Sequence, residues 1–310
     1  MNKLISIVTA CYNEEENVEP LYQEVKNVFK NLPEYRYEHI FIDNASTDRT
    51  VLFLKEIAKN DKNVKIIVNV RNFGHIRSPF YGLLQANGNA VITLVADFQD
   101  PPSMIPVLIK KWEEGSKVVV GVKCQSEENT LIYNVRRFYY RVLHNLSDID
   151  QIQNFTGFGL YDQRIIEILR TIDDPYPFMR GLISEIGYDI TQIEYIQPSR
   201  KRGFTKNNFY SLYDMAMLGI TSHSKVPLRL AAMIGFCLAV ISLFAAFVYT
   251  VYKILYWDSF TVGIAPLVIG LFFFSAVQLF FIGVIGEYIG SIHTRVMKRP
   301  LVIERERINF

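Results

Sequence analysis

Cysteine is scarce in this sequence, and so are net charge and any amino-terminal signal. Cys11, Cys124 and Cys237 are odd in number and far apart, which gives no disulfide framework and no zinc site. The formal net charge is only +2, so the chain lacks the basic excess that nucleic-acid binding requires. The apolar stretch in MNKLISIVTACYNEEE is too short for a secretory signal peptide. We therefore expect no nucleic-acid partner and a cytoplasmic amino-terminal domain.

Apolar residues are abundant, and they concentrate near the carboxyl end. Residues 230–252 and 259–286 contain no charged side chain. At a rise of ~1.5 Å per residue, each run is long enough to cross the ~30 Å hydrocarbon layer of a bilayer as a helix. The alternative is a pair of helices buried in a soluble core, but polar residues usually interrupt such helices over this length. We predict a hairpin of two transmembrane helices.

The charges that flank the two runs predict their orientation. The connection between them holds one acid and no Lys or Arg. The basic residues on the outer sides are Lys225 and Arg229 before the first run, and Arg295, Lys298 and Arg299 after the second. Because basic residues concentrate in cytoplasmic segments, both termini are expected in the cytoplasm.

The amino-terminal part of the chain alternates apolar runs with amphipathic segments. Strands are predicted at 4–11, 37–43, 63–70, 90–97 and 117–122, and helices at 17–32, 46–60, 75–87 and 102–114. The strand runs are almost continuously apolar, as in parallel strands that are covered on both faces. The predicted fold class is α/β, with a mostly parallel open sheet and helices on both faces.

Polar side chains follow four of the predicted strands at the point where each strand ends. They are Tyr12, Asn13 and Glu14 after the first strand, Asp43, Ser46 and Asp48 after the second, Asn72 after the third and Asp97 after the fourth. In open α/β sheets, ligands bind outside the carboxyl ends of the strands. We therefore expect these side chains to line one crevice.

Two of these strand ends carry acids that suit particular ligands. The segment from Asp43 to Asp48 opens a helix, whose backbone N–H groups suit a nucleotide, although Ser46 and Asp48 alone are more often helix caps. In VADFQDPP, a carboxylate at a strand end can hold a hard divalent ion beside a diphosphate. Asp97 fits that role, whereas Asp100 before a proline also fits a turn cap.

A short basic loop precedes the first apolar run. It contains Arg200, Lys201, Arg202 and Lys206. So close to a membrane, these side chains suit the phosphate of a lipid, and general attraction to anionic lipid is the alternative. Arg136 and Arg137 lie in a predicted helix, where arginines are usually solvated.

Together these motifs resemble the family-2, GT-A-fold glycosyltransferases that act on polyisoprenyl phosphates, such as bactoprenol glucosyltransferases and dolichol-phosphate mannose synthases. VTACYNEEENV is similar to the opening nucleotide loop of that family, IDNASTDRT to its D-D-G-S-x-D segment, RNFGHIRSPFYGL to its R-N-x-G helix and VADFQDPP to its D-A-D-L-Q-D-P-P metal motif. PFMRGLISEIGYD and RKRGFTK match later elements. The resemblance runs from residue 4 to about residue 290 and includes the hairpin.

The resemblance implies roles for individual residues. It assigns nucleotide binding to Tyr12, Asn13, Glu14, Asp43, Asn72 and Asp97, a Mg²⁺ or Mn²⁺ ion to Asp97 and Gln99, and the acceptor phosphate to Arg136, Arg137, Arg200, Arg202 and Lys206. Catalysis then rests on Asp97, Arg200 and Lys206. Four positions depart from the family pattern: Asn44 and Val95 replace acids, and Gly157 and Gly159 replace an Asp and an Arg of many relatives.

The implied reaction is transfer of a hexose, with inversion, from a nucleotide-sugar to a polyisoprenyl phosphate. We expect UDP-glucose as the donor, with GDP-mannose or another UDP-sugar as alternatives. A processive polysaccharide synthase would carry a Q-x-x-R-W motif, and neither Trp112 nor Trp257 lies in that setting. A non-catalytic membrane scaffold is the alternative from another class, which Asn44 and Val95 favour.

The chain is expected to divide into four parts. These are a cytoplasmic GT-A-type domain at 1–206, an interfacial or connecting helix at 207–226, two transmembrane helices at 227–290 and a basic cytoplasmic tail at 291–310. The tail fits contact with anionic headgroups or the charge bias of cytoplasmic segments alone. Gly283, Gly286 and Gly290 permit close helix contact, which leaves a homo-oligomer open.

Overall fold

The fold centres on one eight-stranded sheet. The computed structural model describes residues 2–123, 152, 155–198, 213, 217–221, 224–256 and 264–310. Its strands are β1 (Leu4–Cys11), β2 (Arg36–Asp43), β3 (Val64–Asn69), β4 (Ala90–Val95), β5 (Val118–Lys123), β6 (Phe155–Asp162), β7 (Ile190–Tyr195) and β8 (Glu304–Ile308). Across the sheet, the order is β7-β5-β6-β4-β1-β2-β3-β8.

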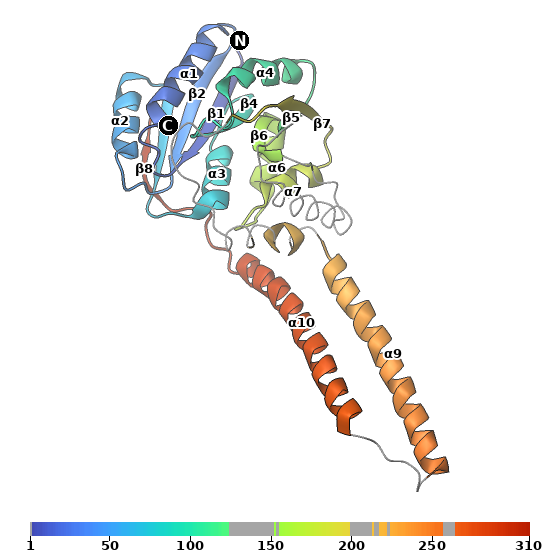
Figure 1. Cartoon of the computed structure of the whole chain (residues 1–310). Coiled ribbons are helices and arrows are strands. Elements are labelled where there is room, and N and C mark those ends of the chain that lie inside the picture. Colours follow the sequence, from blue (N-terminus) through green and yellow to red (C-terminus); the bar gives the residue numbers. More distant parts are fainter. Residues whose placement is uncertain are drawn as a thin grey trace.

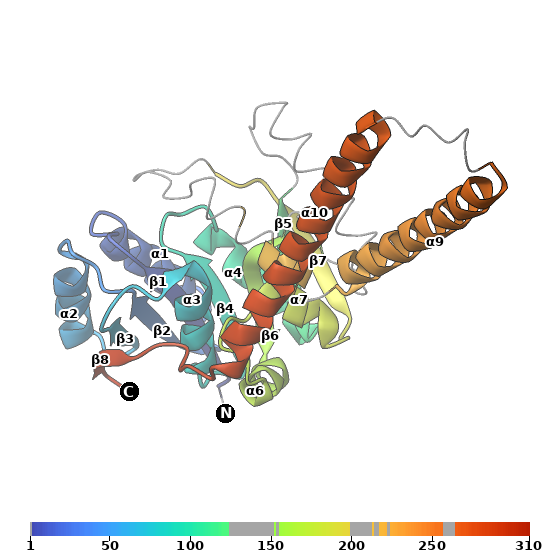
Figure 2. The same cartoon turned by 90° about the horizontal axis from the view of Figure 1, so that it is seen from below.

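Helices cover both faces of the sheet (Figures 1 and 2). On one face lie α1 (Val18–Lys30), α2 (Thr50–Asn60) and α4 (Ile105–Glu113), which the short 3-10 helix η1 (Pro102–Met104) precedes. On the other lie α3 (Gly74–Leu84), α6 (Gln163–Thr171) and α7 (Met179–Glu185). Neighbouring β1 residues serve opposite cores, since Ile7 packs into the first and Val8 into the second. Two apolar layers therefore enclose the sheet, as its apolar strands require.

All five predicted strands are present, and four of them form a parallel core. β1 pairs with β2 and β4, and β2 pairs with β3, all in parallel. The sequence did not predict β6, which lies antiparallel between β4 and β5. Glycines interrupt its sequence, FTGFGLYD, so no continuous apolar run marks it as a strand. The predicted α/β fold class is confirmed.

The two glycines of β6 explain two departures from the family pattern. A Cβ atom at Gly159 would lie 2.4 Å from the carbonyl oxygen of Val119 on β5, which is too close for any side chain. Gly157 has a φ of +104°, a conformation that side chains disfavour. The close approach of β5 and β6 therefore excludes an Arg at position 159, and the backbone disfavours an Asp at position 157.

The last strand comes from the segment that follows the second long helix. β8 pairs antiparallel with β3 and covers that edge of the sheet. The Tyr81 hydroxyl donates to Glu304 at 2.8 Å, and Asn309 Nδ2 donates to the carbonyls of Ala58 and Val64 at 2.8 and 2.9 Å. This strand was not predicted, because its sequence ERERI lacks the apolar residues that usually mark one.

Two long apolar helices extend away from the sheet (Figure 1). They are α9 (Val226–Leu255) and α10 (Ile264–Val296), and each is long and apolar enough to cross a membrane. Their most apolar windows are 0% buried within the protein, so they are not helices of a soluble core. β8 begins near the end of α10 and runs antiparallel to β3. The carboxyl ends of the parallel strands therefore face the two helices (Figure 1).

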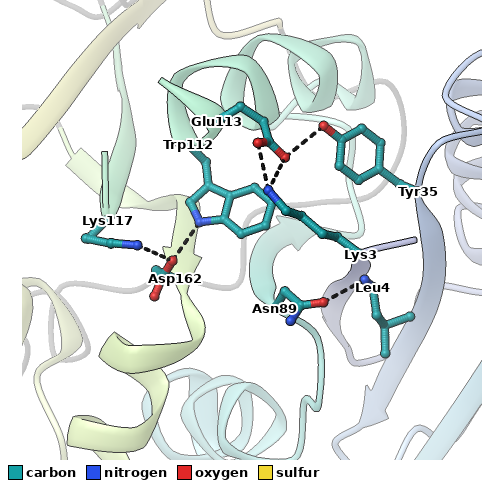
Figure 3. Close-up of polar contacts among 8 residues, drawn as sticks. All are labelled: Lys3, Leu4, Tyr35, Asn89, Trp112, Glu113, Lys117 and Asp162. Atoms are coloured by element: carbon teal, nitrogen blue, oxygen red, sulfur yellow. Dashed lines mark hydrogen bonds and ion pairs between the residues drawn. The ribbon is translucent and has the colours of Figure 1, made fainter. Parts of the chain in front are cut away.

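The opposite, amino-terminal edge of the sheet is closed by paired charges (Figure 3). Lys3 Nζ donates to both carboxylate oxygens of Glu113, at 2.8 and 2.7 Å, and this bond lowers the pKa of Glu113. Lys117 Nζ and Trp112 Nε1 donate to Asp162 at 3.0 and 2.7 Å. Burial acts to raise the pKa of Asp162, but these two bonds outweigh it and the pKa is lowered. The acids of this edge are held as paired carboxylates.

Candidate active site

The loops after β1 and β2 hold each other through Asn13. Asn13 has a positive φ of 56°, a conformation that Asn adopts more readily than most residues. Its backbone N–H donates to Ser46 Oγ at 2.9 Å, and its Oδ1 accepts from the Thr47 N–H at 2.8 Å. The Glu14 N–H donates to Thr50 Oγ1 at 2.8 Å. Two loops that are distant in sequence thus form one hydrogen-bonded unit at the carboxyl edge.

Asp43 ends β2 and lies fully buried beneath this unit. It accepts from the Ser46 N–H at 3.0 Å and from the Ser46 hydroxyl. Burial raises the pKa of Asp43, and the bonds from Ser46 oppose that rise. Ser46 therefore supports the loop and does not cap α2. Asp48 accepts from the Thr50 N–H at 3.0 Å, but the N-cap residue of α2 is Arg49, so Asp48 orders the turn before the helix and is not its cap.

Asn44 uses its whole hydrogen-bonding capacity inside the protein. Its Nδ2 donates to Asn72 Oδ1 at 2.9 Å and to the Gly74 carbonyl at 3.1 Å. Its Oδ1 accepts from Asn69 Nδ2 at 3.2 Å and from the Phe73 N–H at 2.8 Å. An Asn side chain offers two donors and two acceptor sites, so the ends of β2 and β3 are joined through one amide. A carboxylate at this position could not make the two donor bonds.

The turn after β4 presents the candidate metal ligands. Phe98 has a positive φ of 63°, which turns the chain sharply between Asp97 and Gln99. The Gln99 N–H donates to Asp97 Oδ1 at 3.1 Å and fixes that carboxylate at the strand end. Asp97 is 8% exposed. Its side chain is therefore positioned by the turn before any ligand binds.

Asp100 anchors the same turn through buried hydrogen bonds. Asp100 is buried, and it accepts from the Val95 N–H at 3.3 Å and from the Tyr195 hydroxyl at 3.0 Å. Burial raises the pKa of Asp100 to about 7, although the bonds from Tyr195 and Val95 act to lower it. Tyr195 is the last residue of β7. The turn after β4 and the distant strand β7 are therefore joined by one hydrogen bond.

The donor set of this turn fits a hard divalent ion. Asp97 supplies a carboxylate and Gln99 an amide oxygen, the type of ligand that Mg²⁺ and Mn²⁺ prefer. Within the described ranges, no group of three or more His, Cys, Asp and Glu side chains could hold a metal. One or two protein oxygens are nevertheless sufficient for Mg²⁺ where phosphate oxygens and water complete the coordination.

A cavity of about 220 Å³ lies beside the turn, between α3, β4, β6 and α7. His75, Asp100, Gly157 and Arg180 are among its lining residues. Arg180 Nη1 donates to the Phe155 carbonyl at 3.2 Å, which orients the guanidinium at the cavity wall. A concave space with a few polar groups beside a fixed carboxylate is the usual form of a substrate site.

The structure places the predicted residues in two groups. Tyr12, Asn13, Glu14, Asp43, Asn72, Asp97 and Gln99 all lie in the loops or strand ends at the carboxyl edge of β1–β4. Arg136, Arg137, Arg200, Lys201, Arg202 and Lys206 lie outside the described residues. The first group therefore shares one edge of the sheet, as predicted, but none of its members lines the cavity described above. The ligand roles of all these residues stay predictions.

Sequence reasoning missed the part of the site that lies beyond β4. The contact between Tyr195 and Asp100 joins residues 95 positions apart. It depends on β7 lying beside β5, which no local pattern reveals. Arg180 and His75 could both have been singled out, because each lies in a segment that matches a family element.

Comparison with known proteins shows what this architecture belongs to. The model of Glycosyl transferase family 2 matches residues 6–183. The uncharacterized glycosyltransferase YkcC of Bacillus subtilis is 36% identical over 299 residues, which cover 96% of this chain and 92% of that protein. The SfII prophage-derived bactoprenol glucosyl transferase of Shigella flexneri is 34% identical over 304 residues, which cover 96% of each.

A solved structure was also matched. The glucosyl-3-phosphoglycerate synthase of M. tuberculosis aligns with a TM-score of 0.49 at 19% identity, over 71% of this chain and 78% of that chain. The family model covers more than half of the sequence, and the two relatives cover nearly all of it. The chain therefore belongs to glycosyl transferase family 2 and is a glycosyltransferase.

Proposed function

We propose that this enzyme transfers glucose from UDP-glucose to a polyisoprenyl phosphate in a membrane. The observation that carries the proposal is the direction of the carboxyl edge, whose loops hold Asn13, Asp43 and Asp97 and face two helices of membrane-spanning length (Figure 1). A soluble nucleotide-sugar and a lipid-linked acceptor can meet at such an edge. The relatives named bactoprenol glucosyl transferase support both the lipid acceptor and glucose.

The donor is proposed to bind over the loops of β1, β2 and β4. Asn13 and Ser46 hold the first two loops together, so their backbone groups keep a fixed spacing for the nucleoside. Asp97, held by the Gln99 N–H, faces the diphosphate. A divalent ion at Asp97 and Gln99 would neutralise charge on the departing diphosphate. The neighbouring cavity then receives the sugar.

The transfer is proposed to be a single inverting displacement. An acceptor phosphate oxygen forms a bond to the anomeric carbon while the bond from that carbon to the diphosphate oxygen breaks. A phosphate monoester has a second pKa near ~6, so it is largely dianionic at neutral pH and needs no strong general base. This chemistry agrees with Gly157, where many relatives have an acid. Arg200, Arg202 and Lys206 are proposed to hold the acceptor phosphate.

The test is a donor panel with the purified full chain. Polyprenyl phosphate is incubated with UDP-glucose, UDP-galactose, UDP-N-acetylglucosamine or GDP-mannose, and lipid products are identified by mass spectrometry. We expect one hexose per lipid from UDP-glucose and loss of product when the metal is chelated. A lipid product from another donor alone would correct the sugar, and polymer growth would indicate a processive synthase. Failure of every donor would overturn the proposed function.

The proposed orientation places both termini in the cytoplasm. The charge-poor connection between α9 and α10 then lies on the opposite side of the membrane. In a variant with cysteine at Ser259 as its accessible thiol, an impermeant maleimide added outside intact cells should label the protein. If labelling required cell disruption, the orientation would be the opposite of the one proposed. That result would leave the conclusion from the donor panel unchanged.

A further inference from the structure

Three arginines from distant parts of the chain meet where α10 returns to the sheet. Arg71 precedes α3, Arg77 lies near its start, and Arg299 follows the end of α10. Arg77 Nη2 donates to the Pro300 carbonyl, which holds the returning segment against α3. The Cζ atoms of Arg71 and Arg77 lie 4.0 and 5.3 Å from the centre of the Phe73 ring. We call Arg71, Arg77 and Arg299 the arginine cluster.

In the part of the chain that the structure describes, no carboxylate forms an ion pair with this cluster. Arg71 Nη1 donates to the Asn72 carbonyl at 3.1 Å. Arg77 Nε is buried and lacks a hydrogen-bond partner among the described residues. Burial lowers the pKa of Arg77, and the charges of Arg71 and Arg299 lower it further. Such a group of like charges is favoured when an anion joins it.

Nearby basic residues differ from the cluster, because they are already paired. Arg295 lies 3.4 Å from a carboxylate oxygen of Asp174, and Lys298 lies 3.8 Å from one of Asp173. Acids are therefore available beside the end of α10, and they pair with the two neighbours of the cluster. A general excess of positive charge near a membrane does not explain this division.

The position of the cluster indicates the source of the missing anion. A helix that crosses a bilayer ends at the level of the headgroups, and Arg299 lies just beyond the end of α10. Arg71 and Arg77 belong to the carboxyl edge, which faces the same helices (Figure 1). The anion at this level is the phosphate of a phospholipid, which arginine can bind with two hydrogen bonds.

We propose that Arg71, Arg77 and Arg299 form a binding site for the phosphate of an anionic phospholipid. The bound headgroup links the catalytic domain, through α3, to the segment that follows α10. It thereby holds the carboxyl edge at the membrane surface. None of the three arginines belongs to the residues proposed for the donor or the acceptor, and the proposal does not depend on the identity of the transferred sugar.

The experiment measures lipid retention by the full chain in neutral detergent. The protein is titrated with phosphatidylglycerol or with phosphatidylcholine, and bound lipid is counted by native mass spectrometry. Arg299→Gln is the main variant, because Arg299 is exposed. Arg36→Gln, which removes the same charge from an exposed position at the amino edge, is the matched control. Losing one charge-assisted bond weakens binding by roughly ten-fold or more.

We expect selective retention of phosphatidylglycerol, a ten-fold or greater loss in Arg299→Gln and in Arg71→Gln, and no loss in Arg36→Gln. Arg299→Lys should bind with intermediate strength, because it keeps the charge but not the two-pronged geometry. Equal retention of the two lipids, or equal losses in Arg299→Gln and Arg36→Gln, would overturn the proposal. Parallel titrations with polyprenyl phosphate and UDP would also overturn it if the Arg299 effect were confined to either of them.

Discussion

The two edges of the sheet carry acids in opposite electrostatic states. At the amino edge, Glu113 and Asp162 are bound by lysines, and their pKa values are lowered (Figure 3). At the carboxyl edge, burial raises the pKa values of Asp43 and Asp100, and backbone N–H and hydroxyl groups are their hydrogen-bond donors. One edge closes the fold with lysine–carboxylate pairs. At the other, Asp43 and Asp100 accept from hydroxyl and backbone N–H groups, and Asp100 lines a cavity.

The difference separates stability from function within a single sheet. The acids at the amino edge are paired with Lys3 and Lys117 of the protein itself. At the carboxyl edge, Asp100 has a raised pKa and lines a cavity, which is the combination typical of functional centres. Substitutions at the two edges should therefore change different measured quantities, activity at one and stability at the other.

The largest expected effect belongs to Asp97→Asn at the carboxyl edge. The amide keeps the size of the side chain and can still accept from the Gln99 N–H, but it loses the charge that holds a divalent ion. We expect sugar transfer to fall by about a hundred-fold or more, with little change in the thermal midpoint. Transfer rates are measured across a Mn²⁺ titration. A near-parental rate with the same metal response would break the assignment of Asp97.

Asp162→Ala at the amino edge should have the converse effect. It removes acceptors from Trp112 Nε1, from Lys117 and from the Arg164 N–H at the start of α6. Loss of a helix cap and a buried indole partner together should lower the free energy of unfolding by about 3 kcal/mol. Chemical denaturation in detergent measures the change.

The control for Asp162→Ala is Glu114→Ala, which breaks an exposed pair with Lys111 at the same edge. This variant should unfold at the parental denaturant concentration, because exposed pairs contribute little. At a temperature where Asp162→Ala remains folded, the transfer rate of Asp162→Ala should stay near the parental value. If Asp162→Ala lost activity without losing stability, the division between the two edges would be contradicted.

Much of the fold was predictable because local sequence patterns mark most of its strands. The runs that form β1 to β5 are largely apolar, and their alternation with amphipathic helices indicates a parallel sheet. Three strands, β6, β7 and β8, escaped that logic. The sequence of β7, ITQIEY, mixes polar with apolar residues and forms no continuous apolar run. β6 contains Gly159, which its close packing against β5 requires, and Gly157, whose φ is +104°. β8 is charged, and it is a strand because β3 offers an open edge, a fact of tertiary structure.

The candidate site likewise has a part that the sequence predicts and a part that it does not. Asn13, Asp43 and Asp97 were predicted because parallel strands bring their carboxyl ends together. Arg180 and Tyr195 reach the site from beyond β6, and their approach depends on the order of strands in the sheet. The role of Asn44 was also hidden, since a departure from a motif does not reveal the four bonds that replace it.

Asn44→Asp tests whether the carboxyl edge depends on this amide. The carboxylate restores the acid of the family pattern but cannot donate to Asn72 Oδ1 or to the Gly74 carbonyl. We expect the free energy of unfolding to fall by about 2 kcal/mol, since two acceptors lose their donor. The Michaelis constant for the nucleotide-sugar should rise. Unchanged stability with tighter donor binding would show that position 44 serves the ligand and not the loops.

The smallest expected effect is that of Tyr195→Phe. Tyr195 connects β7 to the turn after β4 through its bond to Asp100. The substitution removes one hydroxyl and keeps the ring that packs edge-on against Phe158 at 5.3 Å. Asp100 then loses the donor at 3.0 Å but keeps the Val95 N–H. One hydrogen bond contributes about 1 kcal/mol, so a modest loss of stability is expected. The turn that carries Asp97 should also become less well positioned.

The informative measurement for Tyr195→Phe is therefore the division between kinetic constants. β7 leads into the basic loop proposed to hold the acceptor, while Asp100 supports the donor turn. If the bond aligns these two parts, kcat should fall several-fold, and the Michaelis constants for UDP-sugar and polyprenyl phosphate should change little. Ser116→Ala is the control, because it removes a comparable bond of 2.8 Å to Thr191, at the other end of β7. Equal kcat values in the two variants would show that the Tyr195 bond stabilises the sheet without aligning the site.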